Sequence, residues 1–245
     1  MSSCGRIRIA LIAASIALLR LPSFGSDPVT AARFAVPVLC TPNPSARTRA
    51  RGTAIVVDVS GVVVTAAHVV ADSKSPCILT LLVPNDEWRR ASGFRAFAIE
   101  PCISNELLDV AVCRIHPLER PQDWSYLRAA PLRTQVRPSD VSLTVTGFTG
   151  WGIFPTVVRG HIVSPRQLYR REDGCYCDFA IDTATYQGMS GSPLVNERGE
   201  VIGLITIAGS GKFRGLSFGT SFERAATFLT RAGIRSIVES PQDRR

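Results

Sequence analysis

Three short segments carry side chains that together could cleave an amide bond. Ser190 lies in the glycine-containing run GMSGSP at 188–193, His68 ends the run TAAH, and Asp109 interrupts the apolar run LLDVAV at 107–112. A serine hydroxyl is a poor nucleophile at neutral pH, so it needs a base to remove its proton and an acid to orient that base. All three residue types are present, in the order His, Asp, Ser.

Each of the other two residues has a distinct role in this chemistry. His68 is the candidate general base, because a neutral imidazole can take the serine proton and return it to the leaving amine. Asp109 is the candidate orienting acid, because a carboxylate in an apolar run is costly to bury unless hydrogen bonds reach it. The competing acids are Asp86 and Asp123, and each lies in a polar segment beside a tryptophan.

The three motifs resemble those of trypsin-like serine proteases, with the residue order of chymotrypsin. They are most similar to the bacterial Deg-type (high-temperature-requirement) proteases. The resemblance implies an all-β fold of two six-stranded antiparallel β-barrels followed by a C-terminal α-helix. It also implies a serine endopeptidase that acts on protein or peptide substrates without a cofactor.

The glycines around Ser190 allow a tight turn in which the N–H groups of Gly188 and Ser190 form an oxyanion hole. Two positions depart from the family pattern. Met189 replaces the usual Asp or Asn, so activation through an ion pair between that acid and a newly cut N-terminus is not expected. Ser192 replaces a glycine, and its side chain could tighten the turn.

The substrate pocket is inferred from the family's spacing around the nucleophile. Its base would be Ala184, six residues before Ser190, and one wall would come from 204–208, including Leu204 and Thr206. No acid stands at the base to pair with a substrate Lys or Arg. We therefore expect an uncharged pocket that prefers small or medium aliphatic residues.

The elements around these residues are predicted to be short strands. Residues 53–59 and 62–65, joined by a Ser-Gly turn, predict a β-hairpin that ends just before His68. Further strands follow without intervening helices, which indicates a barrel or sandwich rather than an α/β sheet. They are expected at 77–83, 95–99, 110–115, 141–147, 156–164, 175–181, 193–195, 201–207 and 216–220.

Two segments depart from this strand pattern. Residues 27–50 predict an irregular segment, because four prolines forbid a long helix. Residues 221–234 predict a helix with Ser221 as its N-cap and Gly233 near its end. One face of that helix would be formed by Phe222, Ala225, Ala226 and Leu229.

The N-terminus has the layout of a signal peptide. Two arginines precede an apolar run at 9–19, which is too short to span a bilayer because that takes about 20 residues. We expect 1–25 to direct export to the periplasm or the extracellular space, with an uncleaved anchor or a buried helix as alternatives. The protease domain would occupy 27–239, with barrels at roughly 35–125 and 135–220. A charged tail at 240–245 would leave no room for a PDZ domain, and no later segment predicts a membrane span.

Six cysteines lie beyond the signal segment. An even number in an exported protein predicts up to three disulfides, with 15 possible pairings. No Cys-x-x-Cys pair is present and the histidines lie far apart, so a metal site is not expected. Cys175 and Cys177 share one strand face and are expected to pair elsewhere. The six are Cys40, Cys77, Cys102, Cys113, Cys175 and Cys177.

Composition and residue order exclude several other functions. The net charge of +8 comes from scattered arginines without interleaved aromatic residues, so nucleic-acid binding is not expected. An α/β-hydrolase needs its histidine after the serine, and none follows His161. The remaining alternative is a secreted pseudoprotease that binds peptides or a partner without cleaving them, because Met189 and Ser192 depart from the family pattern.

Overall fold

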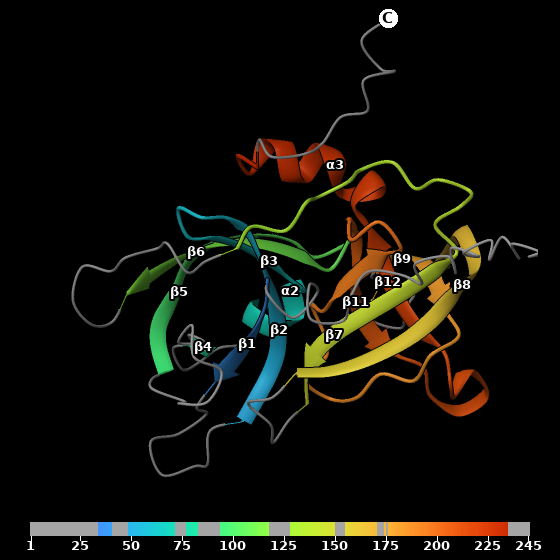
Figure 1. Ribbon diagram of the computed structural model, residues 1–245, viewed down its shortest axis with the longest axis horizontal. Coiled ribbons are helices and arrows are strands. Elements are labelled where there is room, and N and C mark those ends of the chain that lie inside the picture. Colours follow the sequence, from blue (N-terminus) through green and yellow to red (C-terminus); the bar gives the residue numbers. More distant parts are fainter. Residues whose placement is uncertain are drawn as a thin grey trace, which may run out of the picture.

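The described part of the chain folds into two closed β-barrels followed by a C-terminal helix (Figure 1). All pairs of named strands are antiparallel, as the family resemblance implies. The computed structural model describes residues 34–40, 49–71, 77–82, 94–117, 128–149, 155–170, 174 and 176–234. The expected signal peptide and charged tail, and the competing acids Asp86 and Asp123, lie outside these residues.

The first barrel is closed by six strands in the order β1-β2-β3-β6-β5-β4. Its interior is rich in valine and isoleucine, whose branched side chains pack well on a pleated surface. Val57, Val63 and Val110 are completely buried there. The strands are β1 (Ala35–Cys40), β2 (Arg49–Asp58), β3 (Val62–Thr65), β4 (Cys77–Leu82), β5 (Phe94–Asn105) and β6 (Val110–Pro117).

The second barrel is closed in the order β10-β11-β12-β9-β8-β7. Its core contains Leu143, Phe179, Leu194 and Ile202, and it also contains Met189, which comes from the loop before β10 rather than from a strand. The strands are β7 (Ser142–Phe148), β8 (Pro155–Arg170), β9 (Tyr176–Ile181), β10 (Pro193–Asn196), β11 (Val201–Ala208) and β12 (Ser217–Ser221), with a short 3₁₀ helix η1 (Gly211–Phe213) before β12.

The expectation of an irregular segment at 27–50 is wrong for β1 and for the start of β2. Pro37 is tolerated in β1 because the strand pairs with β4 only from Val38 onward, whereas Pro37 faces Thr53 of β2. A proline has no N–H to donate to a neighbouring strand, so it is accepted where one neighbour is missing. The prolines exclude a helix here, but they do not exclude a strand.

The predicted C-terminal helix is present as α3 (Phe222–Arg231). The side chain of Ser221 caps it by accepting a hydrogen bond from the backbone N–H of Arg224 at 3.1 Å. The buried face consists of Phe222, Ala225 and Leu229 and packs in one cluster with residues of both barrels. Gly233 has φ +89° just after the end of the helix, as expected for a C-terminal glycine.

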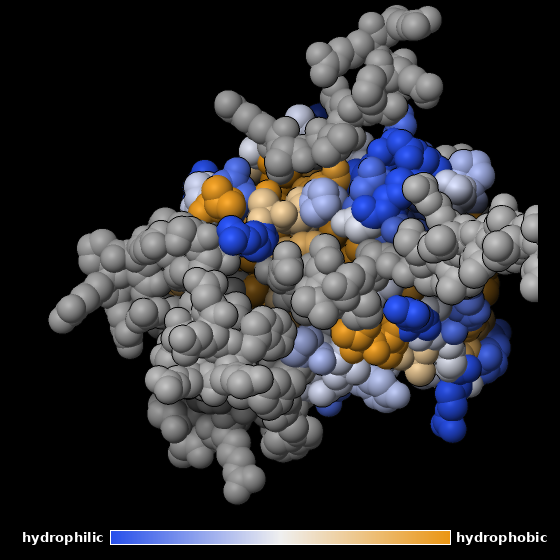
Figure 2. All heavy atoms as spheres, in the orientation of Figure 1, coloured by the Kyte–Doolittle hydropathy of each residue, from blue (hydrophilic) through white to orange (hydrophobic). Residues whose placement is uncertain are grey.

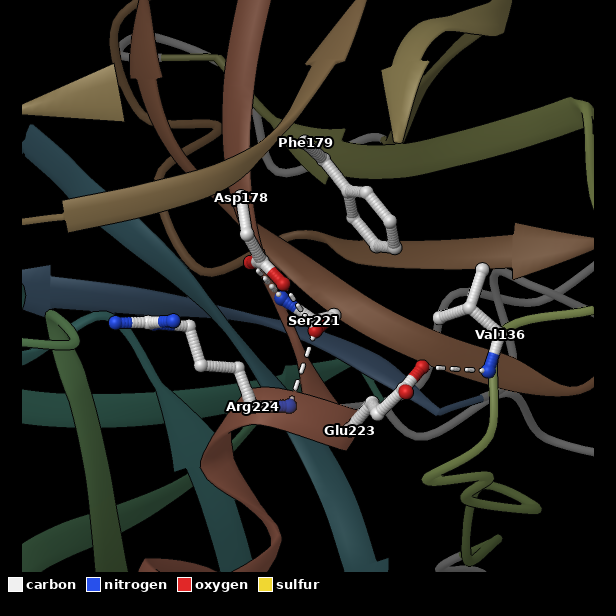
Figure 3. Close-up of a pocket in the computed structure, with 6 residues that line it drawn as sticks. All are labelled: Val136, Asp178, Phe179, Ser221, Glu223 and Arg224. Atoms are coloured by element: carbon white, nitrogen blue, oxygen red, sulfur yellow. Dashed lines mark hydrogen bonds between the residues drawn. The ribbon is translucent and has the colours of Figure 1, made fainter. Parts of the chain in front are cut away.

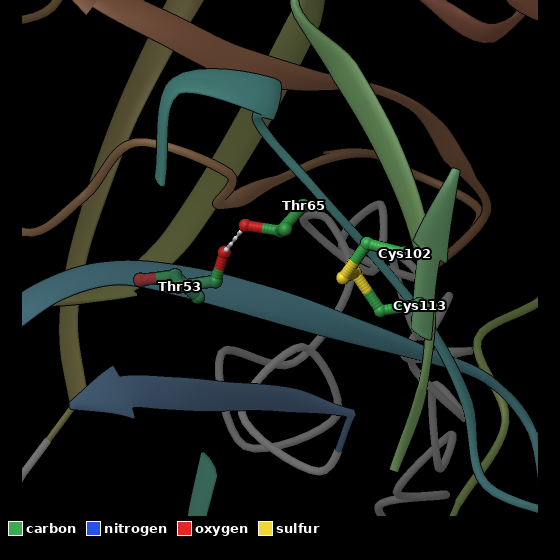
Figure 4. The surroundings of a disulfide bond; sticks show 4 residues. All are labelled: Thr53, Thr65, Cys102 and Cys113. Carbon is green, nitrogen blue, oxygen red and sulfur yellow. Dashed lines mark hydrogen bonds between the residues drawn. A yellow bond between two sulfur atoms is a disulfide. The ribbon is translucent and has the colours of Figure 1, made fainter. Parts of the chain in front are cut away.

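One of the expected disulfides joins Cys102 of β5 to Cys113 of β6, which lie directly opposite each other (Figure 4). The expectation that Cys177 pairs with another cysteine is wrong: it is a buried thiol with its Sγ 3.0 Å from Thr206 Oγ1. Cys175 and the side chains of Cys40 and Cys77 lie outside the part of the chain that is described.

Apolar and polar residues share the described surface. The face shown in Figure 2 has several separate hydrophobic areas between hydrophilic ones. Exposed apolar side chains of the second barrel include Val141, Val157 and Val163. Across the described ranges, no helix is both long and apolar enough to cross a membrane.

Candidate active site

His68 lies on the short helix α2 (Ala67–Ala71), which begins two residues after β3 ends at Thr65. Ala67 and Val69 are buried on either side of it and fix the helix against the first barrel. The His68 side chain faces outward and is 42% exposed. The imidazole is therefore anchored through its neighbours and remains accessible to a reactant.

Asp109 is bound to both the backbone and the ring of His68. The backbone N–H of His68 donates to Asp109 Oδ1 at 2.9 Å, and His68 Nδ1 lies 3.0 Å from Oδ1 and 2.8 Å from Oδ2. The Asp109 carboxylate is only 3% exposed, and these bonds compensate its burial. A carboxylate accepts, so Nδ1 carries the proton and Nε2 is left as the basic nitrogen.

The backbone of Asp109 is held in an unusual conformation. Its φ of +53° is the one positive value among the described non-glycine residues. Asn105 Oδ1 accepts from the N–H of Leu108 at 3.1 Å, and Thr220 of the second barrel donates to the Leu108 carbonyl at 2.8 Å. Asp tolerates the left-handed region better than most residues, and such strain is typical of functional sites.

Ser190 follows a tight turn whose geometry depends on Gly188. The N–H of Met189 donates to the carbonyl of Tyr186 at 2.9 Å, and Gly188 at the third turn position has φ +99°. These are the features of a type II turn, which favours glycine at that position. Within the described residues, the N–H groups of Gly188 and Ser190 donate to no protein acceptor. We call these two N–H groups the open donors, because they have no acceptor among the described residues; Gly188 is buried and Ser190 is half-buried.

Two glycines bring the Ser190 loop against the His68 segment. A Cβ at Gly52 would lie 2.5 Å from a methyl of Val69 and 2.9 Å from the carbonyl oxygen of Ser190. A Cβ at Gly191 would lie 2.0 Å from the carbonyl of Thr53. These approaches leave no room for a side chain, so the Ser190 loop and α2 both pack closely against the backbone of β2.

The hydroxyl of Ser190 is hydrogen bonded to a backbone carbonyl rather than to His68 in the described part of the chain. Its Oγ donates to the carbonyl of Thr206 at 3.4 Å, and no hydrogen bond between described residues joins it to the His68 ring. Catalytic hydrogen bonds are often long or absent before substrate binds.

The residues expected to form the substrate pocket are separated in the structure. Ala184 is exposed, whereas Leu204 is completely buried in the cluster that includes α3, so Leu204 cannot line an open pocket. Thr206 does lie beside the nucleophile through its carbonyl. A bulge between Ile205 and Ile207 interrupts the alternation of β11, which is why Leu204 and Thr206 do not share one wall.

Hydroxyl groups lie instead behind the segment that leads to Ser190. Ser217 is completely buried and donates to the carbonyl of Thr183 at 2.6 Å, so the Thr185 hydroxyl, 2.8 Å away, must donate to Ser217. Asp182 accepts a hydrogen bond from the backbone N–H of His161, which lowers the pKa of Asp182, and its side chain is 43% exposed. Asp182 is thus directed to β8.

Sequence reasoning missed Thr53, a completely buried residue of β2. Its N–H donates to the carbonyl of Ser190 at 2.7 Å, and its hydroxyl donates to the carbonyl of Gly188 at 3.0 Å. The hydroxyl of Thr65 donates in turn to the Thr53 carbonyl at 2.7 Å (Figure 4). The sequence offered little to identify Thr53, since its place at the start of the predicted hairpin before His68 was the one feature that linked it to the site.

A separate cavity of about 210 Å³ lies at the start of α3 (Figure 3). Of its two carboxylates, Asp178 is bound by the N–H and hydroxyl of Ser221, and Glu223 accepts from the N–H of Val136 at 3.2 Å, so both already have partners within the fold. The lining residues are Val136, Asp178, Phe179, Ser221, Glu223 and Arg224. In the described ranges, no group of three or more His, Cys, Asp or Glu side chains could hold a metal ion.

A family model described as "Trypsin-like peptidase domain" matches residues 52–204, a range that contains His68, Asp109 and Ser190. The chain is 31% identical over 164 residues to "Putative serine protease HhoA" of Synechocystis sp., covering 65% of this chain and 37% of that protein. It is 30% identical over 193 residues to "Magnetosome formation protease MamE" of Paramagnetospirillum magneticum, covering 76% of this chain and 24% of that protein. The chain thus spans well under half the length of these two curated relatives.

The architecture also matches a solved structure. The apo form of the MamO protease domain from Magnetospirillum magneticum superposes with a TM-score of 0.61 over 82% of this chain and 97% of that chain. The identity of 15% means that this similarity shows the fold alone.

Proposed function

Because the chain belongs to the trypsin-like peptidase domain family, we propose that it is an exported serine endopeptidase with Ser190 as nucleophile, His68 as general base and Asp109 as orienting acid. The observation that carries this proposal is the clamp of Asp109 on His68 Nδ1, at 3.0 and 2.8 Å. That contact leaves Nε2 as the basic atom on the accessible side of the ring.

In the proposed reaction, Ser190 Oγ leaves the Thr206 carbonyl, turns to His68 Nε2 and loses its proton to it as it attacks the substrate carbonyl. The oxygen of the tetrahedral intermediate would receive hydrogen bonds from the open N–H groups of Gly188 and Ser190. His68 then returns the proton to the departing amine, leaving an acyl group on Ser190. Water, activated by the same imidazole, releases the acid product and restores the enzyme.

The departures from the family pattern fit this proposal. Met189 lies in the core of the second barrel and is 0% exposed, so the turn is anchored by apolar packing where an ion pair is used in trypsins. Ser192 is accommodated because Gly147 has no side chain: a Cβ there would lie 1.9 Å from Ser192 Oγ. The signal-like segment at 1–25 supports the proposed export.

Hydrolysis of casein by the purified protein and by its Ser190→Ala variant tests the proposal. We expect the variant to lose nearly all turnover, with an unchanged melting temperature. The rival is a peptide-binding pseudoprotease, favoured by the absence of a Ser190–His68 hydrogen bond among the described contacts. Binding of peptides without hydrolysis in the wild type, or equal hydrolysis by both proteins, would exclude the endopeptidase.

A further inference from the structure

Thr53 binds the two residues whose N–H groups are the open donors of the active site. Its backbone N–H holds the carbonyl of Ser190, and its hydroxyl holds the carbonyl of Gly188. The same hydroxyl accepts the backbone N–H of Phe148, at the end of β7, at 3.0 Å. One completely buried side chain on β2 of the first barrel therefore joins the turn before Ser190 to the second barrel.

The hydrogen-bond capacity of Thr53 is used in one defined way. A threonine hydroxyl has a single proton, and the carbonyl of Gly188 can only accept, so that proton points to Gly188. The N–H of Phe148 can only donate, so it occupies a lone pair of the hydroxyl. Because both partners have fixed roles, the side chain has one arrangement and holds the Gly188–Met189 peptide group in one position.

We propose that Thr53 is a positioning residue for the oxyanion turn, which we define as residues 186–190. It holds the Gly188 and Ser190 donors at a fixed place relative to His68, which lies on the same barrel as Thr53. This inference rests on the proposed function, because the turn has this role only if Ser190 is acylated. Oxyanion stabilisation acts on the transition state, so misplacing the donors lowers kcat and not substrate affinity.

The first test compares Thr53→Val with Thr53→Ser. Valine keeps the shape but removes the hydroxyl, and we expect kcat to fall at least about tenfold with KM within about twofold of wild type, measured on a fluorogenic peptide. Serine keeps the hydroxyl and should retain most of the wild-type kcat. If Thr53→Val does not fold, Thr53→Ala is used in its place, because it removes the same hydroxyl and introduces a smaller side chain.

A matched control is Ser221→Ala. The Ser221 hydroxyl is also buried, donates once, to Asp178, and accepts once, from the N–H of Arg224, but it serves the α3 cap. We expect this variant to melt at a lower temperature with unchanged kcat. A similar fall of kcat in Ser221→Ala and Thr53→Val would reduce Thr53 to a structural role and overturn the proposal.

A readout without activity separates this inference from the proposed function. The N–H groups of Met189, Gly191 and Ser192 are hydrogen bonded in or beside the turn, so their hydrogen exchange reports its order. We expect faster exchange of peptides covering 186–192 in Thr53→Val than in Ser221→Ala. Unchanged exchange in these peptides would overturn the inference, even if the protein has no hydrolytic activity. If neither the wild type nor any variant hydrolyses the peptide, that result counts against the proposed function instead.

Discussion

At the scale of single residues, the site depends on how a buried acid is satisfied. The Asp109 carboxylate receives the N–H of His68 as well as its ring, so one side chain fixes both the position of α2 and the tautomer of the imidazole. A second His–Asp pair, His161 with Asp182, lies on the exposed surface of the second barrel. The two pairs differ in burial, because the side chain of Asp109 is 3% exposed and that of Asp182 is 43% exposed.

Replacing Asp109 by Asn tests its proposed role. The amide can offer its N–H₂ group to Nδ1, which favours the tautomer with the proton on Nε2, and we expect kcat to fall by about 10⁴-fold. The matched control is Asp182→Asn, which alters the exposed pair and should leave kcat within about twofold. A harmless Asp109→Asn together with an inactive Asp123→Asn would assign the orienting role to the other acid.

The contact between Gly147 and Ser192 gives a prediction about stability. The Ser192 hydroxyl is buried and has no hydrogen-bond partner in the described part of the chain. Gly147→Ala should destabilise the fold strongly, because its Cβ would meet Ser192 Oγ at 1.9 Å. Adding Ser192→Gly should recover part of the loss, with a coupling of about 1–3 kcal/mol in urea unfolding. Additive effects would show that the two positions are independent.

At the scale of elements, the sequence pattern predicted the elements that depend on residues close together in the chain. The hairpin before His68 and the helix after Ser221 follow from alternating valines and from a capped apolar face, and both are present. Strand β1 was missed because the prolines were taken to indicate an irregular segment, whereas Pro37 lies where β1 pairs with β2 alone and leaves the strand intact. The candidate triad followed from the motifs and their order. The hydrogen bonds of Thr53 to Gly188 and Ser190 could not be predicted, because they form only when the two barrels come together and no local sequence pattern records that.

The β10–β11 hairpin gives a prediction about pH. Burial raises the pKa of Glu200, but hydrogen bonds from Asn196, Arg198 and Arg133 outweigh it and lower that pKa to about 2. A pKa below the unfolded value contributes stability above that unfolded value, and the contribution is lost as the pH falls from about 5 towards 2. We expect the melting temperature of wild type to fall more steeply in this window than that of Glu200→Gln. The exposed neighbour Glu197→Gln should behave as wild type, and parallel curves for all three would contradict the assignment.

At the scale of the whole molecule, the proposed site is assembled across two barrels. The first supplies His68, Asp109 and Thr53, and the second supplies the loop with Ser190 and the threonine that supports Asp109, Thr220. Both barrels must therefore fold and dock before the donors and the base come together. The segment before Ser190, which contains the expected pocket base Ala184, also belongs to the second barrel.

Substrate preference is predicted from the uncharged groups in that segment. Ala184 at the expected pocket base is uncharged and exposed, and Asp182 is directed to His161. A substrate Lys or Arg would leave its charge unpaired, so Val, Ala or Leu before the scissile bond should exceed Arg or Lys by at least about tenfold in kcat/KM. A peptide-library profile dominated by Arg, and abolished by Asp182→Asn, would show that Asp182 reaches the substrate.

The central claim is that Ser190 is an activated nucleophile, and labelling with a fluorophosphonate followed by peptide mass spectrometry tests it most directly. We predict one adduct per chain, located on Ser190, that is lost on denaturation before labelling and strongly reduced in His68→Ala. A fluorophosphonate requires an activated serine and no knowledge of the substrate. No adduct on the folded wild-type protein, or an adduct on another residue with Ser190 unmodified, would contradict the claim.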